Sequence, residues 1–168
     1  MKHNRNKSKT NLTEYSKNTC RAISTKLFDK VFKFLIVPFS KEEATYREIF
    51  KNDEVRRAEM IYFMSKHLEH LKFNSYQIGL AVCYADRFAT GLANQGFKFT
   101  YRLIKSVVIL SITAAYKMTS DECYSTLTLE RSFRIYNLDE LEATYYELVN
   151  YHLYFTAEDI EKYLKTLL

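Results

Sequence analysis

Glycine and proline are scarce in this chain of 168 residues, which contains 3 glycines and 1 proline. Folds built from many short strands need more turn residues than this, and so do the glycine-rich loops that hold nucleotide phosphates. The hydrophobic share is nevertheless 47%, which is enough for one buried core in a chain of this size. The composition therefore predicts a single all-α domain.

Long hydrophobic runs are also lacking. The longest one, Ser106–Tyr116, lies between Lys105 and Lys117 and is far shorter than the roughly 20 residues that a membrane-spanning helix needs. It predicts a buried core helix instead. The polar, basic start of the chain is not followed by an apolar stretch with a cleavage site, so we expect no secretory signal. These absences predict an intracellular protein, cytoplasmic or nuclear, with no membrane partner.

The sequence signatures of common enzymes are absent. The chain has no phosphate-binding glycine motif, no Gly-x-Ser-x-Gly and no His-Glu-x-x-His. His67 and His70 share a helix face with Glu69 nearby, but no other His or Cys stands at ligand spacing, which favours an exposed polar face over a metal site. The three cysteines are widely spaced and odd in number, which predicts reduced structural thiols. We therefore expect no catalytic residue, metal or cofactor.

Positive charge is concentrated at the start of the chain. Residues 1–35 hold nine Lys or Arg against two acidic residues, so they carry +7 of a net charge of +5, and the remainder carries −2. Residues 1–11 have no apolar periodicity and predict a disordered basic leader. Such a leader can attract nucleic acid or act as a nuclear address, but a solvated tail explains it equally well. We therefore rank nucleic acid behind protein as a partner.

An N-terminal helical extension is predicted over residues 12–52. Apolar residues at three- and four-residue steps indicate one helix over 13–37, and Pro38 ends it. Ser40 opens a Ser-x-x-Glu capping box, which predicts a short helix to about residue 51. The main domain would then occupy residues 53–168.

Six further helices are predicted in the main domain, at about 53–71, 76–90, 101–118, 121–134, 138–151 and 156 to the end. The second and third are apolar around most of their circumference, which predicts burial on most sides, and 101–118 would be the central helix. Side-chain caps are expected from Asn74, Asn137 and Thr156 with Asp159. Residues 91–96 are interpreted as a loop with a glycine at the helix terminus.

Three charges inside these helices are not explained by helix capping, namely Asp86, Lys117 and Glu142. Asp86 lies in a nearly all-apolar stretch, where an unpaired buried carboxylate costs several kcal/mol on an order-of-magnitude scale. A base on another helix is therefore expected, and Arg57 is the candidate. The 14 tyrosines cluster near the end of the chain, which suits core packing or a protein interface.

Four short segments carry a resemblance to the cyclin box. Ala-Val-Cys-Tyr-Ala-Asp-Arg-Phe at 81–88 resembles the Tyr-Ile-Asp-Arg-Phe segment of that box, and Ala-Ala-Tyr-Lys at 114–117 resembles its Ala-Ser-Lys segment. Leu-Asp-Glu-Leu-Glu at 138–142 is similar to the Leu-Glu pair that opens the fifth box helix, and Val-Arg-Arg-Ala at 55–58 to the Met-Arg-Ala that opens the first. Order and spacing agree over about residues 53–165, and the pattern is most similar to single-box P/U-type, phosphate-pathway-like cyclins.

The resemblance implies a cyclin-box five-helix bundle around a central buried helix, with an N-terminal extension helix and a short C-terminal helix. It also implies a non-catalytic regulator of the cell-cycle class, whose partner is a cyclin-dependent serine/threonine kinase. The residues matching Arg57 and Asp86 would form a structural ion pair. By the same resemblance, the kinase-binding residues would be Lys117, Glu142, Met118, Tyr146, Tyr151 and Leu153.

Alternatives remain at two points. Lys117 and Glu142 could simply pair with each other on the surface, and the chain could be a cyclin-fold adaptor, or a transcription-factor-like scaffold, that contacts nucleic acid through its basic N-terminus. The helix that would carry a substrate-docking groove reads Arg-Arg-Ala-Glu-Met at 56–60, with Phe63 in place of the usual tryptophan. Because charges replace the apolar groove floor, we do not expect that kind of substrate docking.

Overall fold

The part of the chain that the structure describes is entirely helical. The structure, a computed structural model, describes residues 17–32, 54–121 and 125–167. Within these ranges there is no strand, which confirms the predicted all-α class. The elements are α1 Lys17–Lys26, the π-helix η1 Leu27–Phe32, α4 Glu54–His70, α5 Ser75–Asn94, α6 Tyr101–Thr119, α7 Thr126–Phe133, α8 Leu138–Leu148 and α9 Ala157–Leu167. The predicted leader at 1–11, the stop at Pro38 and the helix at 40–51 lie outside the described residues.

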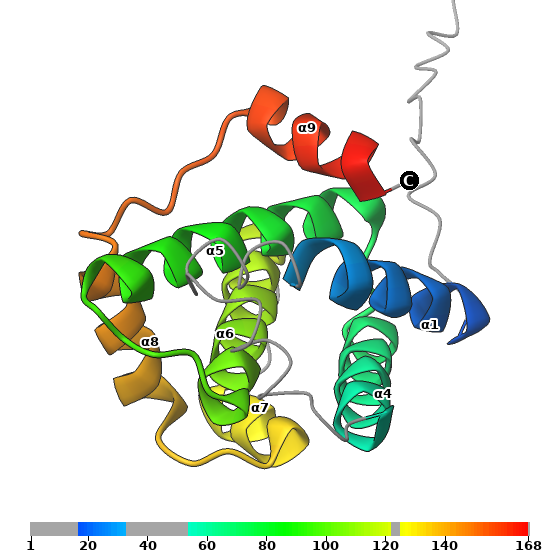
Figure 1. Cartoon of the computed structure of the whole chain (residues 1–168), viewed down its shortest axis with the longest axis horizontal. Coiled ribbons are helices and arrows are strands. Elements are labelled where there is room, and N and C mark those ends of the chain that lie inside the picture. The colour runs from blue at the N-terminus through cyan, green and yellow to red at the C-terminus, as the bar shows by residue number, and fades with distance from the viewer. Residues whose placement is uncertain (1–16, 33–53, 122–124, 168) are drawn as a thin grey trace, which may run out of the picture.

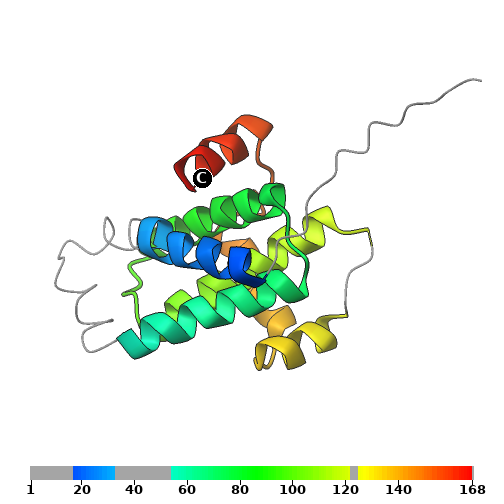
Figure 2. The same ribbon diagram turned by 90° about the vertical axis from the view of Figure 1, so that its right-hand side faces the viewer.

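Helix α6 forms the centre of the bundle (Figure 1 and Figure 2). Every side chain from Val107 to Tyr116 is buried, as the apolar run predicted. α5 packs across α6, while α9 lies on the side of α5 that faces away from α6. α1 packs against α4, and α8 contacts both α5 and α6. α5 and α6, the two helices that are apolar on most sides, are thus also the two helices that have neighbours on most sides.

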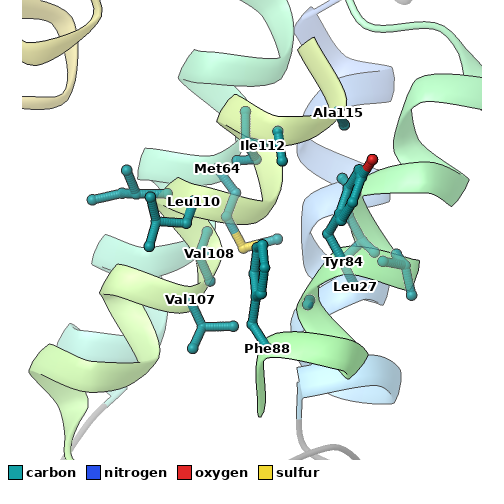
Figure 3. Close-up of a cluster of buried hydrophobic side chains, with 14 of the residues drawn as sticks. Leu27, Met64, Tyr84, Phe88, Val107, Val108, Leu110, Ile112 and Ala115 are labelled. Atoms are coloured by element: carbon teal, nitrogen blue, oxygen red, sulfur yellow. The ribbon is translucent and has the colours of Figure 1, made fainter. Parts of the chain in front are cut away.

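The middle of the core is shared by η1, α4, α5 and α6 (Figure 3). Phe88 of α5 has no exposed surface, and Met64 of α4 has 1%. Each fully buried side chain of this kind stabilises the fold by about 1.5–3 kcal/mol. This burial explains why α6 is helical although β-branched residues crowd its centre, because tertiary contact outweighs a weak local preference. The side chains labelled in the figure are Leu27, Met64, Tyr84, Phe88, Val107, Val108, Leu110, Ile112 and Ala115.

Two of the three helix caps predicted in the main domain are confirmed. Asn74 Oδ1 accepts from Gln77 N at 2.9 Å, and Asn74 N donates back to Gln77 Oε1 at 3.0 Å. At the last helix, Thr156 N donates to Asp159 Oδ2 at 3.0 Å and Asp159 N donates to Thr156 Oγ1 at 3.2 Å. Both are reciprocal pairs that satisfy backbone N–H groups at a helix start.

The third cap was predicted wrongly. Asn137 has left-handed backbone angles, φ 60° and ψ 42°, and its side chain makes no capping bond. A side-chain cap needs extended angles at that position, so the local Asn-x-x-Glu pattern was misleading. Glu130 of α7 takes over this role, because its Oε1 accepts from Leu138 N at 2.8 Å. The start of α8 is therefore stabilised by a neighbouring helix, which local sequence could not indicate.

Several predicted boundaries also shift. α5 continues through Gly91 to Asn94, so only the end of the predicted 91–96 loop is a turn, where Gly96 has a φ of +78°. Gly91 stays helical and lies close to α8, since a Cβ there would be 3.1 Å from Leu148 Cγ. Within 13–37, the described part is an α-helix that changes to a π-helix at residue 27. α7 begins at residue 126 rather than 121, and α8 ends at 148 rather than 151.

His67 is buried, which corrects the expectation of an exposed polar face for this residue. Its side chain has 3% exposure and lies between the rings of Phe63 and Phe133, at centroid distances of 4.2 and 4.3 Å. The ring nitrogens lie 2.7 Å from Phe63 O and 3.2 Å from Ser132 O, so His67 links α4 to α7. Only His70 has the predicted exposure. A histidine in an amphipathic helix can lie on the buried or on the exposed face. Here the packing of α7 against α4 buries His67.

The stability of the protein is expected to fall in mild acid because of His67. Burial lowers the pKa of this histidine, and this effect outweighs the two carbonyl contacts that raise it. The folded state therefore prefers the neutral ring. Its contribution is complete above the unfolded pKa of about 6.5 and is lost as pH falls, with a slope of at most about 1.4 kcal/mol per pH unit. Urea unfolding between pH 7.5 and 5 should show a smaller slope for His67→Gln, whereas the exposed control His70→Gln should retain the parental slope.

Candidate functional site

Lys117 and Glu142 form an ion pair between the last turn of α6 and α8. Lys117 Nζ donates to Glu142 Oε1 at 2.7 Å. The side chains keep 26% and 10% of their exposure, so the carboxylate is almost withdrawn from water. Lys117 also lies where the negative end of the α6 dipole favours a cation. Two of the three charges that helix capping leaves unexplained are therefore in direct contact, and the pair is partly buried rather than on the open surface.

A tyrosine supports the carboxylate from the same helix. Tyr146 lies one turn after Glu142 on α8, and the charge of Glu142 acts on its hydroxyl. Burial raises the pKa of Tyr146, and the charge of Glu142 raises it further. The phenol therefore stays protonated at neutral pH. The Lys117 ammonium offsets part of the desolvation of Glu142, and the neutral phenol adds no opposing charge beside it.

Aromatic rings from α5 and α8 meet behind this cluster. Phe88 packs edge-on against Tyr145, with centroids 5.4 Å apart, and lies 6.4 Å from the Tyr146 ring. Burial raises the pKa of Tyr145 to about 12. The Tyr145 hydroxyl is buried and has no hydrogen-bond partner among the described residues. Packed aromatic rings therefore back the cluster, and one of them contacts Tyr146.

The C-terminal end of α6 is anchored to the start of α5. Gln77 Nε2 donates to Thr119 Oγ1 at 2.8 Å, and Thr119 Oγ1 donates to Ala115 O at 2.7 Å. Gln77 is buried, so its amide needs this partner. Met118, between Lys117 and Thr119, is 52% exposed. The anchor thus holds the backbone of α6 in place where Met118 projects from it.

The segment that follows α8 is held against α5 by two side chains. Tyr84 Oη donates to Leu153 O at 2.7 Å. Arg87 Nη1 donates to His152 O at 2.6 Å and to Tyr154 O at 3.1 Å. Both residues lie in the segment 81–88, but the sequence pattern predicts no role for them. Their position next to Asp86, inside an otherwise apolar helix, is the signal that could have indicated one. They position a loop whose backbone would otherwise have few partners.

Tyr151 is 64% exposed at the turn that ends α8. Asn150 and Tyr151 both have left-handed backbone angles, with φ 51° and 56°. Tyr151 N donates to Tyr146 O at 2.7 Å, which ties the turn to the Glu142 cluster. Of the six predicted kinase-binding residues, Lys117 and Glu142 are thus in contact, Tyr146 lies one turn after Glu142, Met118 and Tyr151 are exposed, and Leu153 is half-buried.

The predicted structural ion pair between Arg57 and Asp86 does not form. Arg57 instead makes a forked pair with Asp29 of η1, at 3.0 Å from Nε to Oδ1 and 2.5 Å from Nη2 to Oδ2. Asp86 accepts a hydrogen bond from the hydroxyl of Tyr163 on α9. The reason is tertiary: α9 covers the face of α5 that carries Asp86, while η1 supplies the carboxylate next to α4. The expectation that Asp86 needs a partner was sound, but the partner was wrong.

Double-mutant cycles can test this corrected pairing. Tyr163→Phe removes the donor to the half-buried Asp86 and is expected to cost about 1–2 kcal/mol, with strong coupling to Asp86→Asn. Arg57→Gln breaks a pair that is 42% and 46% exposed and should cost about 1 kcal/mol or less, additively with Asp86→Asn. Urea unfolding provides the free energies. Coupling between Arg57 and Asp86 would contradict the assignment.

Other chemistry is not evident in the described residues. They contain no group of three or more His, Cys, Asp or Glu side chains that could hold a metal ion. Cys20 and Cys83 are buried and form no disulfide within the described residues, and burial raises the pKa of the Cys83 thiol to about 12, so it stays protonated. Cys123 lies outside the described residues. None of the described helices is both long enough and apolar enough to cross a bilayer.

Comparison of the chain with protein-family models, with curated proteins and with solved structures finds no match.

Proposed function

We propose that the chain is a regulatory cyclin subunit, which binds a cyclin-dependent serine/threonine kinase and activates it. The binding surface would combine the end of α6, the Glu142 face of α8 and the turn after α8. The protein would supply no catalytic group of its own and would act inside the cell, in the cytoplasm, the nucleus or both. The cyclin-box arrangement of the helices is part of this proposal.

The Lys117–Glu142 pair is the observation that carries the proposal. The pair joins two helices at 2.7 Å and is flanked by the exposed Met118 and Tyr151. A partly desolvated charged pair beside aromatic and methionine side chains has the composition of an interface hot spot. Its two residues also stand at the places where the cyclin resemblance puts kinase contacts. The missing Arg57–Asp86 pair counts against the resemblance, so the proposal depends on this surface and not on that pair.

The proposed mechanism is a population shift in the kinase. A kinase is active when the glutamate of its C-helix reaches the catalytic lysine. Lys117 would donate to backbone carbonyls beside that helix, and Glu142 would accept from backbone N–H groups, while Met118 and Tyr151 pack on its apolar face. A surface that binds only the inward position of the C-helix favours the active conformation of the kinase. The size of the shift is set by the difference between the affinities of the surface for the active and the inactive conformation.

Affinity capture from the native cell tests the proposed function. The tagged full-length protein should retain a cyclin-dependent kinase, identified by mass spectrometry, and should raise the activity of that recombinant kinase towards a Ser/Thr peptide. A tagged Tyr151→Asp variant is the control for specific capture, because it changes a single exposed residue of the proposed kinase-binding surface. Retention of the kinase without any increase of activity would contradict a regulatory subunit.

The adaptor function remains the second candidate because of the +7 charge of residues 1–35. Deleting residues 1–11 separates the two functions. A large, salt-dependent loss of DNA affinity on deletion would support the adaptor. Unchanged kinase activation by the shortened chain would support the cyclin.

A further inference from the structure

A pocket of about 660 Å³ lies between the N-terminal half of α6 and the turn that joins α7 to α8. Its volume is in the range of sites for small organic ligands and peptide side chains. Apolar side chains line it together with polar and charged ones. The lining residues used below are Arg102, Lys105, Ile109, Arg134, Tyr136 and Glu140.

Three cations line this pocket against one carboxylate. Arg102 and Arg134 are exposed, and neither forms an ion pair within the part of the chain that the structure describes. Lys105 is held by the ring of Phe63, with Nζ 5.1 Å from the centroid. Among the described residues that line the pocket, Glu140 is the only carboxylate, so these residues carry a net charge of +2. This excess stands out because the chain beyond residue 35 is negative overall.

The turn at the mouth of the pocket is fixed by backbone bonds. Arg134 is left-handed with a φ of 53°, and Ile135 N donates to Glu130 O at 3.0 Å. The Glu130 side chain also accepts from Leu138 N at 2.8 Å, so one residue holds both ends of the turn. Tyr136 is 89% exposed on this rigid turn. A fixed turn holds the backbone of Arg134 and Tyr136 in place, so a ligand has to order only their side chains.

We propose that this pocket binds the phosphate group of a phosphorylated peptide. Two guanidinium groups and an ammonium in one pocket match the charge and the hydrogen-bond acceptors of a phosphomonoester dianion. Ile109 and the neighbouring apolar side chains offer a floor for a hydrophobic residue beside the phosphorylated one, and Tyr136 offers a ring at the rim. Nucleic acid fits less well, because a single cationic pocket offers contacts to only one or two phosphates of a long polyanion.

The pocket is separate from the proposed kinase surface. Arg102 and Lys117 lie near opposite ends of α6, which has 19 residues and is therefore about 28 Å long. Binding of a phosphopeptide by the isolated chain does not require a kinase. The inference therefore stands or falls independently of the proposed function.

The inference is tested by titrating the isotopically labelled full chain with a blocked peptide, Ala-Leu-phosphoserine-Leu-Ala. Changes in the amide NMR shifts report binding of the peptide. Saturable shifts are expected in residues 102–109 and 133–144, with affinity at least about tenfold above that of the unphosphorylated peptide. Arg102→Gln and Arg134→Gln should each weaken binding by about tenfold. Glu140→Gln should strengthen binding of the phosphopeptide. Arg131→Gln is the matched control and should leave the affinity unchanged, because Arg131 lies on α7, just before the turn, but outside the pocket lining.

Three results would overturn the inference. One is binding of inorganic phosphate as tightly as the phosphopeptide, which would mean an adventitious ion only. Another is stronger binding of a single-stranded oligonucleotide that is lost in Arg102→Gln and Arg134→Gln, which would assign the pocket to nucleic acid. The last is an equal loss of affinity in Arg131→Gln, which would mean that net charge, not the pocket, attracts the peptide. Circular dichroism of each variant confirms that the surface substitutions leave the fold unchanged.

Discussion

Exchanging the two charges of the central pair, as Lys117→Glu together with Glu142→Lys, is expected to weaken kinase binding at least about 100-fold while the fold persists. The exchange keeps an opposite-charge pair between α6 and α8 but presents each charge at the place of the other. A kinase whose carbonyls accept from Lys117 would then meet a carboxylate, and its N–H groups would meet an ammonium. Such mismatches in a desolvated contact cost several kcal/mol.

The single variants should behave differently from the exchange. Lys117→Glu places two carboxylates side by side, and Glu142 is only 10% exposed. Breaking a fully buried pair costs about 3–5 kcal/mol, and because Lys117 is 26% exposed we expect about 2 kcal/mol here. The exchange variant should recover most of that loss in urea unfolding. Stability and kinase binding are thereby measured as separate quantities.

A matched exchange elsewhere provides the control. Lys165 and Glu161 form an exposed pair on α9, with a distance of 3.1 Å and exposures of 76% and 62%. Lys165→Glu with Glu161→Lys should leave both stability and kinase binding unchanged, because exposed pairs contribute little. If the exchange at Lys117 and Glu142 leaves kinase binding intact, the surface assigned to the kinase is wrong.

Phe88→Ala is expected to destabilise the protein by about 4 kcal/mol, which is the largest effect that we expect on folding. The ring has no exposed surface and contacts Tyr84, Tyr145 and Tyr146. Its removal loses the transfer free energy of the ring and leaves a cavity between α5 and α8. Because typical domains are stable by only about 5–15 kcal/mol, the variant should be partly unfolded near physiological temperature.

Urea unfolding followed by circular dichroism measures this effect. Phe97→Ala is the control, since Phe97 is 55% exposed in the turn before α6 and should cost about 1 kcal/mol or less. Phe88→Leu should recover about half of the loss, because leucine fills part of the cavity. A loss of less than about 1 kcal/mol for Phe88→Ala would mean that the ring is not part of a packed core.

Hydrophobic periodicity predicted the helices best where a helix is buried on most sides. Capping rules predicted helix starts best where the cap involves residues close in sequence. α6 was predicted within one residue at its C-terminal end, because an apolar run between two lysines leaves few other solutions. The caps at Asn74 and Thr156 involve residues three apart and were also predictable. Gly91 was not, since a glycine inside a helix and a glycine that ends one look alike until the neighbouring α8 is known.

The sequence predicted the charged residues of the candidate site but not the contacts that hold them in position. Lys117 and Glu142 could be found because each is a charge in an apolar helix that capping does not explain. Their contact needed the tertiary structure, as did the roles of Tyr84 and Arg87, because these side chains bind the backbone of a segment more than 60 residues away. His67 was misplaced for a similar reason, since its burial depends on α7.

The sequence by itself determined that the chain is helical, that its two most apolar segments are central, and that Asp86, Lys117 and Glu142 need partners. These conclusions follow from local hydrophobic periodicity and from the cost of an unpaired buried charge, which hold in any fold. Only the tertiary structure decided which partners the charged residues have: Tyr163 for Asp86, Asp29 for Arg57, and Lys117 for Glu142. The physical reason is that a charge specifies the kind of partner it requires, whereas helix packing specifies which one is within reach.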